Sequence, residues 1–412
     1  MKRVLVIGAG AAGSMAAIFA AEAGARTTLL ESTPDGGRKI LISGGGRCNV
    51  LPAHVDESRF VTDSSPHALR RMLRSWPLRE QIPFFEQELG VALAEEEESG
   101  KLFPQSNRAR DVRDALLDMA KRKGARLVMG ARVTKLHPPR DADRGWRIEI
   151  ADGEPLQADA VIVAAGGLSI PKTGSDGAGL GMARRLGHVV HPTYAALTPL
   201  TAQPAPFAEL AGVSLDLHLE ARSETRRAEA DGGFLFTHRG YSGPSVLDVS
   251  HVAVRSVEEG GPRASLFVRW CERDSQAWNE ALRPDGARTV ANSLRSELPA
   301  RLADALAAAA GVEPSRPLAQ LRREERLALA ETLGRFELPW TGHAGYAAAE
   351  VTGGGVDLAE IDARTMESRK HTGLFFCGEV LDAFGPIGGY NFLWAWATGR
   401  AAGLGAAAVT SP

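Results

Sequence analysis

Cysteine is scarce in this sequence, with three residues in 412: Cys48, Cys271 and Cys377. They lie far apart in the chain and form no C-x-x-C pair. Neither a disulfide framework nor a thiolate zinc site is therefore expected. A mechanism that cycles a pair of thiols is not expected either.

An excess of charge of one sign is also lacking, because 48 Lys and Arg residues oppose 50 Asp and Glu residues. The formal net charge of −2 gives no reason to expect a nucleic acid or an anionic membrane as a partner. No stretch provides the roughly 20 apolar residues that a membrane span needs. We expect a globular protein that binds a small molecule, and nothing in the sequence indicates its oligomeric state.

The uncharged N-terminal segment 4–21 follows Lys2 and Arg3 and has the composition of a secretory signal. Glycines at positions 8, 10 and 13 interrupt the apolar helix that a signal requires. A short buried strand at 4–7 followed by a turn and a helix explains the segment better. We therefore expect a cytoplasmic protein.

Glycine is abundant, with 45 residues, and the first cluster carries chemistry. Gly8-Ala9-Gly10-Ala11-Ala12-Gly13 matches G-x-G-x-x-G directly after the strand at 4–7. In this motif the first glycine makes a tight turn, the second admits a pyrophosphate and the third allows close helix–strand packing. A second strand at 26–30 ends in Glu31, which can accept a hydrogen bond from a ribose hydroxyl and would repel a 2′-phosphate. The pattern predicts a site for the ADP half of FAD or NAD.

A second glycine cluster spans residues 36–49 and contains Arg38, Lys39 and Arg47. Positive charge on a backbone with little steric bulk suits a diphosphate or an electron-rich ring. A flexible surface loop is the alternative, although the apolar run 40–42 is a poor choice for one. Cys48, within this cluster, is equally readable as a small buried core residue.

The C-terminal segment has the features expected around an isoalloxazine ring. A buried strand at 374–377 leads to Gly378 and Glu379, and Glu379 can accept a hydrogen bond from a ribityl hydroxyl. A side-chain-poor turn at 385–389 precedes Asn391, which we expect to cap a helix running to about residue 408. The start of that helix can face the flavin N1–C2=O edge, where reduction places negative charge. An ordinary amphipathic helix is the alternative, and Trp394 and Trp396 are assigned to the core.

Coarse patterning supports an interrupted α/β domain. We expect a helix capped by Ser106 and running to about residue 123, strands at 126–136, 146–150 and 157–164, and a turn-rich segment at 138–145. From about residue 191 the composition changes. Strands are expected at 213–221 and 264–270, and helices at 293–310 and 317–336.

Several stretches resemble the BaiN-like flavoproteins, also called the aminoacetone-oxidase family. They are GRKILISGGGRCN at 37–49, AAGG at 164–167, GFLFTHRGYSGP at 233–244, VTGGGV at 351–356, FFCGEVLD at 375–382 and GGYN at 388–391. The resemblance covers residues 1 to about 405. It implies an α/β fold with an FAD-binding two-dinucleotide domain of the Rossmann-like, glutathione-reductase type, interrupted by an inserted β-barrel and helical domain. One departure is TGSDGAGL at 173–180, where the family usually has TGSTGDGY, which puts the usual contacts of that loop in doubt.

Because one FAD must contact both ends of the chain, the FAD-binding domain is expected to be discontinuous, with residues 1–190 and 345–412. The insert is expected at 191–344, with its β-barrel part at about 191–275 and its helical part at about 290–340. The cleft between the two is the expected substrate site.

Residues expected to hold FAD lie in both chain ends. They are Gly8, Gly10, Ala12, Gly13, Glu31, Arg38, Lys39, Ser43, Gly44, Gly45, Arg47, Cys48, Asn49, Val133, Ala165, Gly166, Gly378, Glu379, Gly389, Asn391 and Phe392. Flavin chemistry passes hydride through the ring, so no catalytic side chain is demanded. The weak candidates are Cys48, His238 and Tyr241, and a structural role is the favoured interpretation of each. His188 and His191 are assigned structural roles, and no metal is proposed.

The expected activity is that of an FAD-dependent oxidoreductase. There is no second G-x-G-x-x-G between a strand and a helix, so NAD(P)H is a possible transient donor without a domain of its own. We favour a reductase with an organic acceptor. An amine oxidase that uses oxygen, an NAD-dependent dehydrogenase and a non-catalytic nucleotide-binding regulator are the alternatives.

Overall fold

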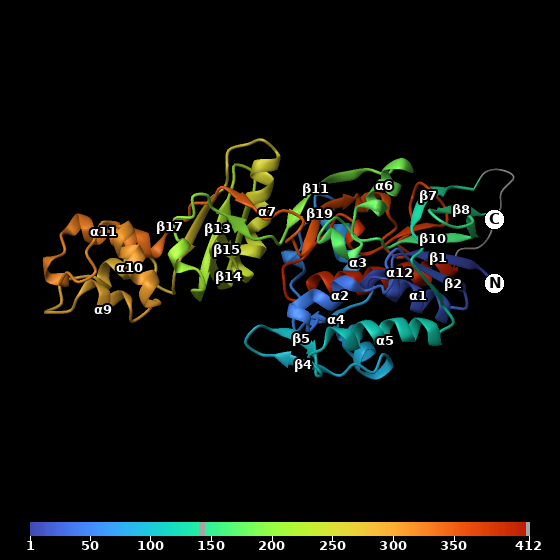
Figure 1. Ribbon diagram of the computed structural model, residues 1–412, viewed down its shortest axis with the longest axis horizontal. Coiled ribbons are helices and arrows are strands. Elements are labelled where there is room, and N and C mark those ends of the chain that lie inside the picture. Colours follow the sequence, from blue (N-terminus) through green and yellow to red (C-terminus); the bar gives the residue numbers. More distant parts are fainter. Residues whose placement is uncertain (140–144, 409–412) are drawn as a thin grey trace. The chain divides into compact units, whose positions relative to one another are not determined.

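The computed structural model describes residues 1–139 and 145–408, so the turn expected at 138–145 lies mostly outside the described residues. The chain divides into two compact units (Figure 1). Unit 1 contains residues 1–193 and those from 351 onward, and unit 2 is Tyr194–Glu350. The sequence-based boundaries were 190/191 and 344/345. No helix in the described chain is long and apolar enough to cross a bilayer.

A five-stranded parallel sheet in the order β20-β10-β1-β2-β6 forms the centre of unit 1. Its strands are β1 (Arg3–Ile7), β2 (Arg26–Glu31), β6 (Arg126–Met129), β10 (Ala160–Val163) and β20 (Leu374–Phe376). β10 and β20 are buried at every position. Continuous apolar runs of this kind are expected where helices or other sheets cover both faces of a parallel sheet.

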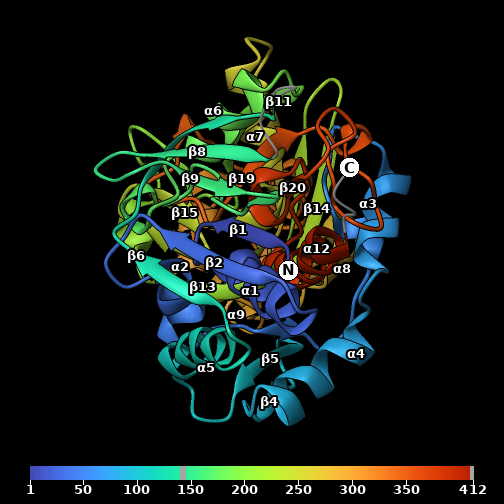
Figure 2. The ribbon, with the colours of Figure 1, turned by 90° about the vertical axis from the view of Figure 1, so that its right-hand side faces the viewer.

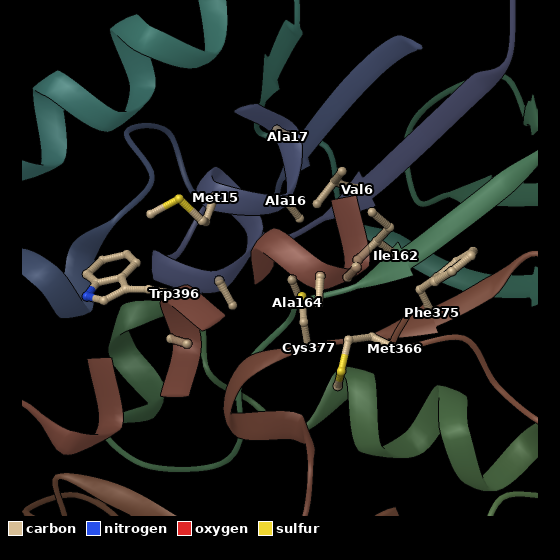
Figure 3. Packing of buried hydrophobic residues seen from close by; sticks show 14 of the residues in the cluster. Val6, Met15, Ala16, Ala17, Ile162, Ala164, Met366, Phe375, Cys377 and Trp396 are labelled. Atoms are coloured by element: carbon tan, nitrogen blue, oxygen red, sulfur yellow. The ribbon is translucent and has the colours of Figure 1, made fainter. Parts of the chain in front are cut away.

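Helices α1 (Ala11–Glu22) and α12 (Tyr390–Ala408) pack on each other beside this sheet. A Cβ at Gly399 would overlap the carbonyl oxygen of Ala12, and one at Gly403 would overlap that of Ala16. The two glycines therefore allow the helix backbones to touch. Figure 3 shows the apolar core to which both helices contribute. In this view Met15 and Trp396 lie on one side of Ala164 and Phe375 lies on the other.

Two other sheets belong to unit 1. A meander of β7 (Val133–His137), β8 (Trp146–Ile150) and β9 (Leu156–Ala158) lies on the side of the parallel sheet opposite α1 (Figure 2). The small sheet β3-β5-β4 contains Leu51–Pro52, Lys101–Pro104 and Leu93–Glu96. The remaining helices are α2 (Arg38–Ile42), α3 (Pro66–Leu73), α4 (Leu78–Pro83), α5 (Ala109–Arg122) and α6 (Ala178–Arg185).

Three expected elements of unit 1 have different bounds. The strand at 126–136 is two strands, β6 in the parallel sheet and β7 in the meander, because Gly130 turns the chain with φ +73°. The strand at 157–164 is also two strands, which divide at Asp159: β9 belongs to the meander and β10 to the parallel sheet. Ser106 does not cap α5; Arg108 holds the N-cap position, and Asn107 makes a turn with φ +53°.

Two strands carry the chain out of unit 1 and back. β11 (Val190–Ala196) and β19 (Val351–Val356) pair as a two-stranded sheet. Unit 1 ends within β11 at Thr193 and resumes at the first residue of β19.

Unit 2 is built on a seven-stranded antiparallel sheet in the order β17-β16-β13-β14-β15-β12-β18. The strands are Phe336–Glu337, Ser265–Arg269, Ser214–Arg222, Arg227–Thr237, Gly240–Ser242, Leu200–Thr201 and Gly342–His343. Helix α7 (Pro244–Glu258) packs on β13 and β14. The helices α8 (Ser275–Ala281), α9 (Val290–Leu294), α10 (Ala300–Ala309) and α11 (Arg323–Gly334) gather at the β17 end of the sheet (Figure 1).

The two long helices expected in the insert are shorter than predicted. The one at 293–310 is divided into α9 and α10, because Pro299 stands at the N-cap of α10 and disfavours a helical residue before it. The one at 317–336 begins only at Arg323, after a 3-10 turn at Leu318–Gln320.

Candidate cofactor site

The carboxyl ends of the parallel strands meet at one edge of the sheet in unit 1. Ile7, Glu31, Val163 and Phe376 end β1, β2, β10 and β20 at that edge. Ligands of open α/β sheets bind outside this edge. Glycine-rich turns follow directly after β1, β10 and β20, so the segments expected to hold the cofactor are brought together by the fold.

The turn after β1 has the geometry that its glycines predict. Gly8 has φ +101° and donates its N–H to the carbonyl of Leu30 at 2.8 Å, and a Cβ there would lie 2.6 Å from the carbonyl oxygen of Ala164. A Cβ at Gly13 would overlap the carbonyl oxygen of Gly8. A Cβ at Gly10 would meet no protein atom within 4 Å. Space in front of a helix N-terminus is therefore left at Gly10, where a diphosphate can bind backbone N–H groups.

Glu31 is buried, with 7% of its surface exposed. Its Oε2 accepts a hydrogen bond from the N–H of Ala9 at 2.8 Å, and its Oε1 accepts from the N–H and hydroxyl of Thr33, both at 2.7 Å. A carboxylate has about four acceptor positions. Oε1 also accepts from the Ser32 hydroxyl at 3.4 Å, whereas Oε2 accepts only from Ala9 among the described residues and keeps an acceptor position for a ribose hydroxyl.

The second glycine cluster folds as α2 and a 3-10 segment at Ser43–Gly46. Gly44 and Gly45 are left-handed, with φ +54° and +67°, and so is Cys48, with φ +64°. Ser43 holds the loop by donating its hydroxyl to Ile40 at 2.8 Å and accepting the N–H of Cys48 at its carbonyl at 3.0 Å. These hydrogen bonds give the segment a defined turn, in which Ile42 and residues 44–46 are exposed and Cys48 is buried.

The two arginines of this cluster have acidic partners. Arg38 lies 2.6 Å from Asp35, and Arg47 lies 2.9 Å from Glu96 with its guanidinium 4.0 Å from the ring centre of Phe103. Their charges are partly balanced within the protein.

Lys39 instead joins the N-terminal segment to the C-terminal one. Its Nζ lies 2.5 Å from Glu379 Oε2 and also donates to the hydroxyl of Ser169. Glu379 Oε1 accepts from the Ser169 hydroxyl at 2.7 Å and from the N–H of Thr352 at 2.9 Å. Gly167 makes room for this group, because a Cβ there would overlap the Thr352 hydroxyl.

Ser169 and Thr352 belong to this cluster and were missed by the sequence analysis. Ser169 is fully buried and Thr352 is 1% exposed. Ser169 lies just after the glycine-rich stretch 164–167, and Thr352 lies within the stretch 351–356. The sequence analysis had singled out both stretches, and this proximity is the signal that could have identified the two residues. Ala165 and Gly166, which has φ +71°, lie in the same turn as Ser169, whereas Val133 begins β7 and is buried.

The turn at 385–389 meets the second glycine cluster. Asn49, with its amide oriented to satisfy both partners, donates to the carbonyl of Leu51 and accepts the N–H of Gly389, both at 3.1 Å. Gly389 has φ +92°, and a Cβ there would overlap the backbone of Leu51. Phe392 stacks on Trp396 with ring centres 5.2 Å apart.

The expected capping role of Asn391 is wrong. α12 already begins at Tyr390, and the Asn391 side chain points back to the preceding turn. Its Oδ1 accepts from the N–H of Gly385 at 3.0 Å, and its Nδ2 donates to the carbonyl of Gly385 at 2.9 Å. The residue closes the turn that precedes the helix, which a short polar side chain can do as well as capping.

Two of the three thiols, those of Cys48 and Cys377, lie in the hydrophobic core of unit 1. Cys48 is fully buried, and burial raises the pKa of its thiol to about 12. Burial also raises the pKa of Cys377. All three cysteines are unpaired.

The candidates from the insert lie in unit 2 and differ in exposure. Tyr241 is 1% exposed and donates its hydroxyl to the carbonyl of Pro339 at 2.8 Å, and burial raises its pKa. This is a structural role. His238 is exposed in the turn between β14 and β15.

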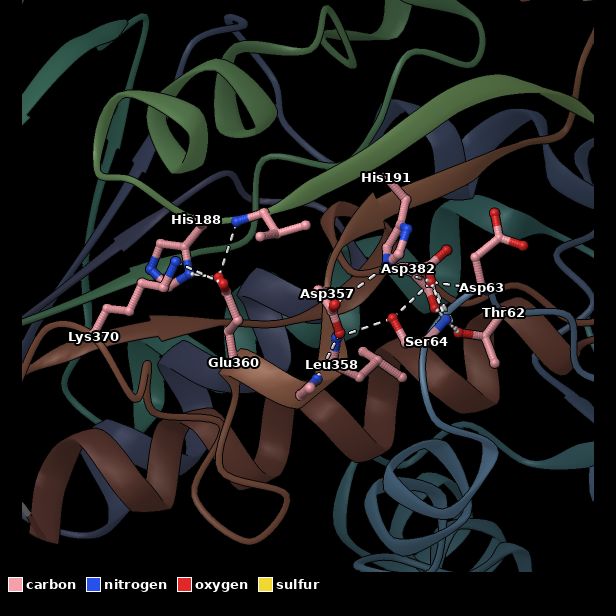
Figure 4. Close-up of polar contacts among 12 residues, drawn as sticks. Thr62, Asp63, Ser64, His188, His191, Asp357, Leu358, Glu360, Lys370 and Asp382 are labelled. Atoms are coloured by element: carbon pink, nitrogen blue, oxygen red, sulfur yellow. Dashed lines mark hydrogen bonds and ion pairs between the residues drawn. The ribbon is translucent and has the colours of Figure 1, made fainter. Parts of the chain in front are cut away.

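His188 and His191 take part in a polar network beside the cofactor segments (Figure 4). His188 Nδ1 lies 2.9 Å from Glu360, its Nε2 lies 3.0 Å from the Ser368 hydroxyl, and burial lowers its pKa. His191 Nε2 lies 3.4 Å from Asp357 and 3.7 Å from Asp382.

Asp382, which is 1% exposed, is a centre of this network and was not singled out by the sequence analysis. Its Oδ2 accepts from the Ser64 hydroxyl at 2.7 Å, from the Ser64 N–H at 2.8 Å and from the Asp63 N–H at 2.9 Å. These contacts tie the segment before α3 to the segment after β20.

The residues at this edge fit FAD. The turn at 8–13 has space for a diphosphate, and Glu31 is oriented for a ribose. The segments 39–49 and 378–391 contact each other through Lys39 with Glu379 and through Asn49 with Gly389. Fold and site together define a flavoprotein of the FAD-binding Rossmann class. A flavocytochrome c3 fumarate reductase in its open conformation has the same fold, with a TM-score of 0.50 and 17% identity over 98% of this chain and 78% of that chain.

The family follows from the sequence comparisons. The family model described as HI0933-like protein Rossmann domain matches residues 2–405, and the chain belongs to this family. It is 34% identical to a ribosomal RNA dihydrouridine synthase of Escherichia coli strain K12, over 96% of this chain and 95% of that protein. It is 32% identical to a 3-dehydro-bile acid delta(4,6)-reductase of Clostridium scindens, over 99% of both chains. The resemblance found in the sequence and the FAD-binding α/β fold are thereby confirmed.

Proposed function

We propose that this protein is an FAD-dependent reductase of a carbon–carbon double bond conjugated to a carbonyl group. The observation that carries the proposal is the chemistry shared by two relatives with unlike substrates. Dihydrouridine forms when the C5=C6 bond of uridine, conjugated to C4=O, is reduced. A delta(4,6)-reductase of a 3-dehydro bile acid acts on double bonds conjugated to a 3-oxo group. Both relatives match nearly the whole chain.

Bound FAD would supply hydride transfer, and the protein would hold the cofactor and orient the acceptor. Glu31 would bind the ADP ribose, Gly10 and the start of α1 the diphosphate, and Glu379 the ribityl chain. NAD(P)H is the proposed electron donor. The three thiols are unpaired, and Cys48 and Cys377 are buried, so they give no support to a dithiol route to the flavin.

Two substrate classes are candidates, a small cyclic enone and a uridine in RNA. The balanced charge of the chain favours the enone, because it shows no overall attraction for RNA. The 34% identity to the dihydrouridine synthase favours uridine.

The test has two stages under anaerobic conditions. The FAD-loaded protein is first mixed with NADH, NADPH or a small amine as the electron donor, and loss of the flavin absorbance is followed. The protein reduced by NADH or NADPH is then mixed with a steroid enone, an unmodified ribosomal RNA fragment or a small ketone as the acceptor. Reoxidation by an enone or by RNA, with the saturated product found by mass spectrometry, is expected.

Three results would contradict the proposal. Bleaching by an amine alone, with fast reoxidation in air and peroxide formation, would identify an oxidase. A protein that binds FAD but exchanges electrons with nothing would be a regulator. A protein that takes up no FAD would not be a flavoenzyme.

A further inference from the structure

Reduction of a conjugated double bond needs a proton as well as a hydride. Hydride adds to the β-carbon, the electron pair of the double bond moves toward the carbonyl as an enolate, and a proton must then reach the α-carbon. An acid positioned beside the acceptor typically accelerates such a step by about 10²–10⁴-fold. The proposed function therefore requires either solvent or a side chain to deliver this proton.

Few ionisable groups at the candidate site suit that role. The Cys48 thiol is fully buried and has a pKa of about 12, so it is a poor donor. Glu31 serves the ADP end of the site. Arg38 and Arg47 are held by Asp35 and Glu96, and a guanidinium does not give up its proton in a protein.

Lys39 has the geometry of a positioned donor. An ammonium group has three N–H bonds, and contacts to Glu379 and Ser169 occupy two of them. The side chain is 25% exposed, so the third can reach a ligand. Lys39 also lies between the N-terminal and C-terminal segments that the cofactor must contact, and no other ion pair does this among the cofactor residues described above.

The partners of Lys39 are fixed in turn. Glu379 Oε1 accepts from Ser169 and from the N–H of Thr352. The Thr352 hydroxyl accepts the N–H groups of Leu168 and Ser169 at 2.7 and 3.1 Å. Ser169 and Thr352 are almost completely buried. Because Glu379 and its buried hydrogen-bond partners fix the position of the Lys39 ammonium group, this lysine is pre-organised, as a catalytic residue needs to be.

We propose that Lys39 is the acid of the oxidative half-reaction and that Glu379, Ser169 and Thr352 are its positioning residues. The inference rests on the proposed function. Bound FAD, with electrons drawn from NAD(P)H, would supply the hydride that the β-carbon of the acceptor takes up. The Lys39 ammonium gives a proton to the α-carbon, and the neutral lysine that remains regains a proton from solvent.

The decisive experiment compares the two half-reactions in Lys39→Met, Lys39→Arg and the wild type, each loaded with FAD. Lys39→Met should accept electrons from NAD(P)H within a few-fold of the wild-type rate. Its reoxidation by the conjugated acceptor should slow by about 10²–10⁴-fold. Reoxidation by ferricyanide, which needs no proton donor, should not slow, because loss of the cation makes the reduced flavin easier to oxidise. Lys121→Met, which removes an exposed lysine paired with Asp118 on α5, is the control.

Lys39→Arg separates proton donation from charge. An arginine keeps the cation and can pair with Glu379, but it stays protonated. It should retain FAD as the wild type does and still lose the fast oxidative half-reaction. Because the cation is kept, this variant also answers the question if Lys39→Met fails to hold the cofactor.

Sulfite binding gives a readout that needs no substrate. Sulfite adds to flavin N5 and places negative charge on the ring, which a nearby cation stabilises. Lys39→Met should weaken sulfite binding by about tenfold or more, and Lys39→Arg should not. Failure of the wild type to reduce any conjugated acceptor would refute the proposed function. Unchanged sulfite affinity in Lys39→Met, or an unchanged oxidative half-reaction in either variant, would instead overturn the role of Lys39.

Discussion

The carbonyl oxygen of Gly8 occupies the space that a side chain at Gly13 would need. The turn after β1 and the first turn of α1 thus touch backbone to backbone. This contact fixes the direction in which α1 leaves the sheet and leaves Gly10 open in front of the helix. Two glycines of one motif are consequently needed for different reasons.

Alanine substitutions should separate these reasons. Gly13→Ala should disrupt unit 1, because its Cβ would overlap backbone that cannot move without displacing β1 or α1. Gly10→Ala should fold like the wild type, because its φ of −79° suits any residue and no protein atom lies within 4 Å. It should nevertheless lose FAD affinity, since the methyl group would stand where a diphosphate approaches. Circular dichroism and fluorimetric FAD titration measure the two effects.

A Gly10→Ala protein that binds FAD normally would show that the diphosphate lies elsewhere. A stable Gly13→Ala protein would contradict the close packing itself.

Removal of the Glu31 carboxylate should weaken FAD binding. Glu31→Ala leaves a ribose hydroxyl without its acceptor, at a cost on the order of 1–3 kcal/mol in binding free energy. Glu31→Gln keeps the volume and one acceptor oxygen and should lose less. Equilibrium dialysis against FAD measures both affinities. Equal affinity in all three proteins would mean that Glu31 only holds Ala9 and Thr33.

Cys48 should be dispensable for electron transfer. Cys48→Ser should retain FAD and most of the turnover, because the thiol is buried and has a pKa of about 12. In the folded wild type, iodoacetamide at mildly alkaline pH should label the half-buried Cys271 before Cys48 or Cys377. Peptide mass spectrometry reads the order of labelling. Loss of all turnover in Cys48→Ser with FAD still bound would assign the thiol a chemical role.

His188 should make the stability of unit 1 depend on pH. Its pKa is lowered by burial, so the unfolded chain binds a proton more readily than the folded one. The stability that neutral His188 contributes is present above the unfolded pKa of about 6.5 and is lost as pH falls through the lower folded pKa. The stability difference between wild type and His188→Gln should therefore narrow from pH 7.5 to pH 5.5 in urea unfolding. The exposed residue in His238→Gln serves as the control, and a constant difference would contradict the assignment.

Much of the fold was predictable, because short-range rules decide it. The apolar runs at 4–7 and 160–163 and the glycines at 8, 10 and 13 each favour one local structure, and together they predict a Rossmann sheet. Element ends were harder to predict. Asn391 satisfies the rule for a helix cap, yet its amide finds two partners at Gly385, a contact set by the preceding turn and not by the helix.

For the candidate site, the sequence indicated glycines and charged residues but not which of them contact each other. Lys39 and Glu379 were each assigned to the cofactor, and nothing in the sequence indicates that they lie 2.5 Å apart. Their contact depends on Gly167 and Ser169, in the turn after β10, and on Thr352, in β19. Such contacts arise from packing between segments far apart in the chain, which periodicity and motif spacing do not encode.

The close contact between α1 and α12 also has a consequence for biosynthesis. α1 leaves the ribosome before unit 2, whereas strand β20 and α12 emerge only after the whole of unit 2. Until then the Rossmann motif lacks an edge strand and the helix that covers Ala12 and Ala16. Unit 2 is continuous in sequence and can fold while the chain is still being made. The cofactor-binding unit cannot be completed before α12 has been made, so α1 and the strands that precede unit 2 are the segments that would need protection by chaperones.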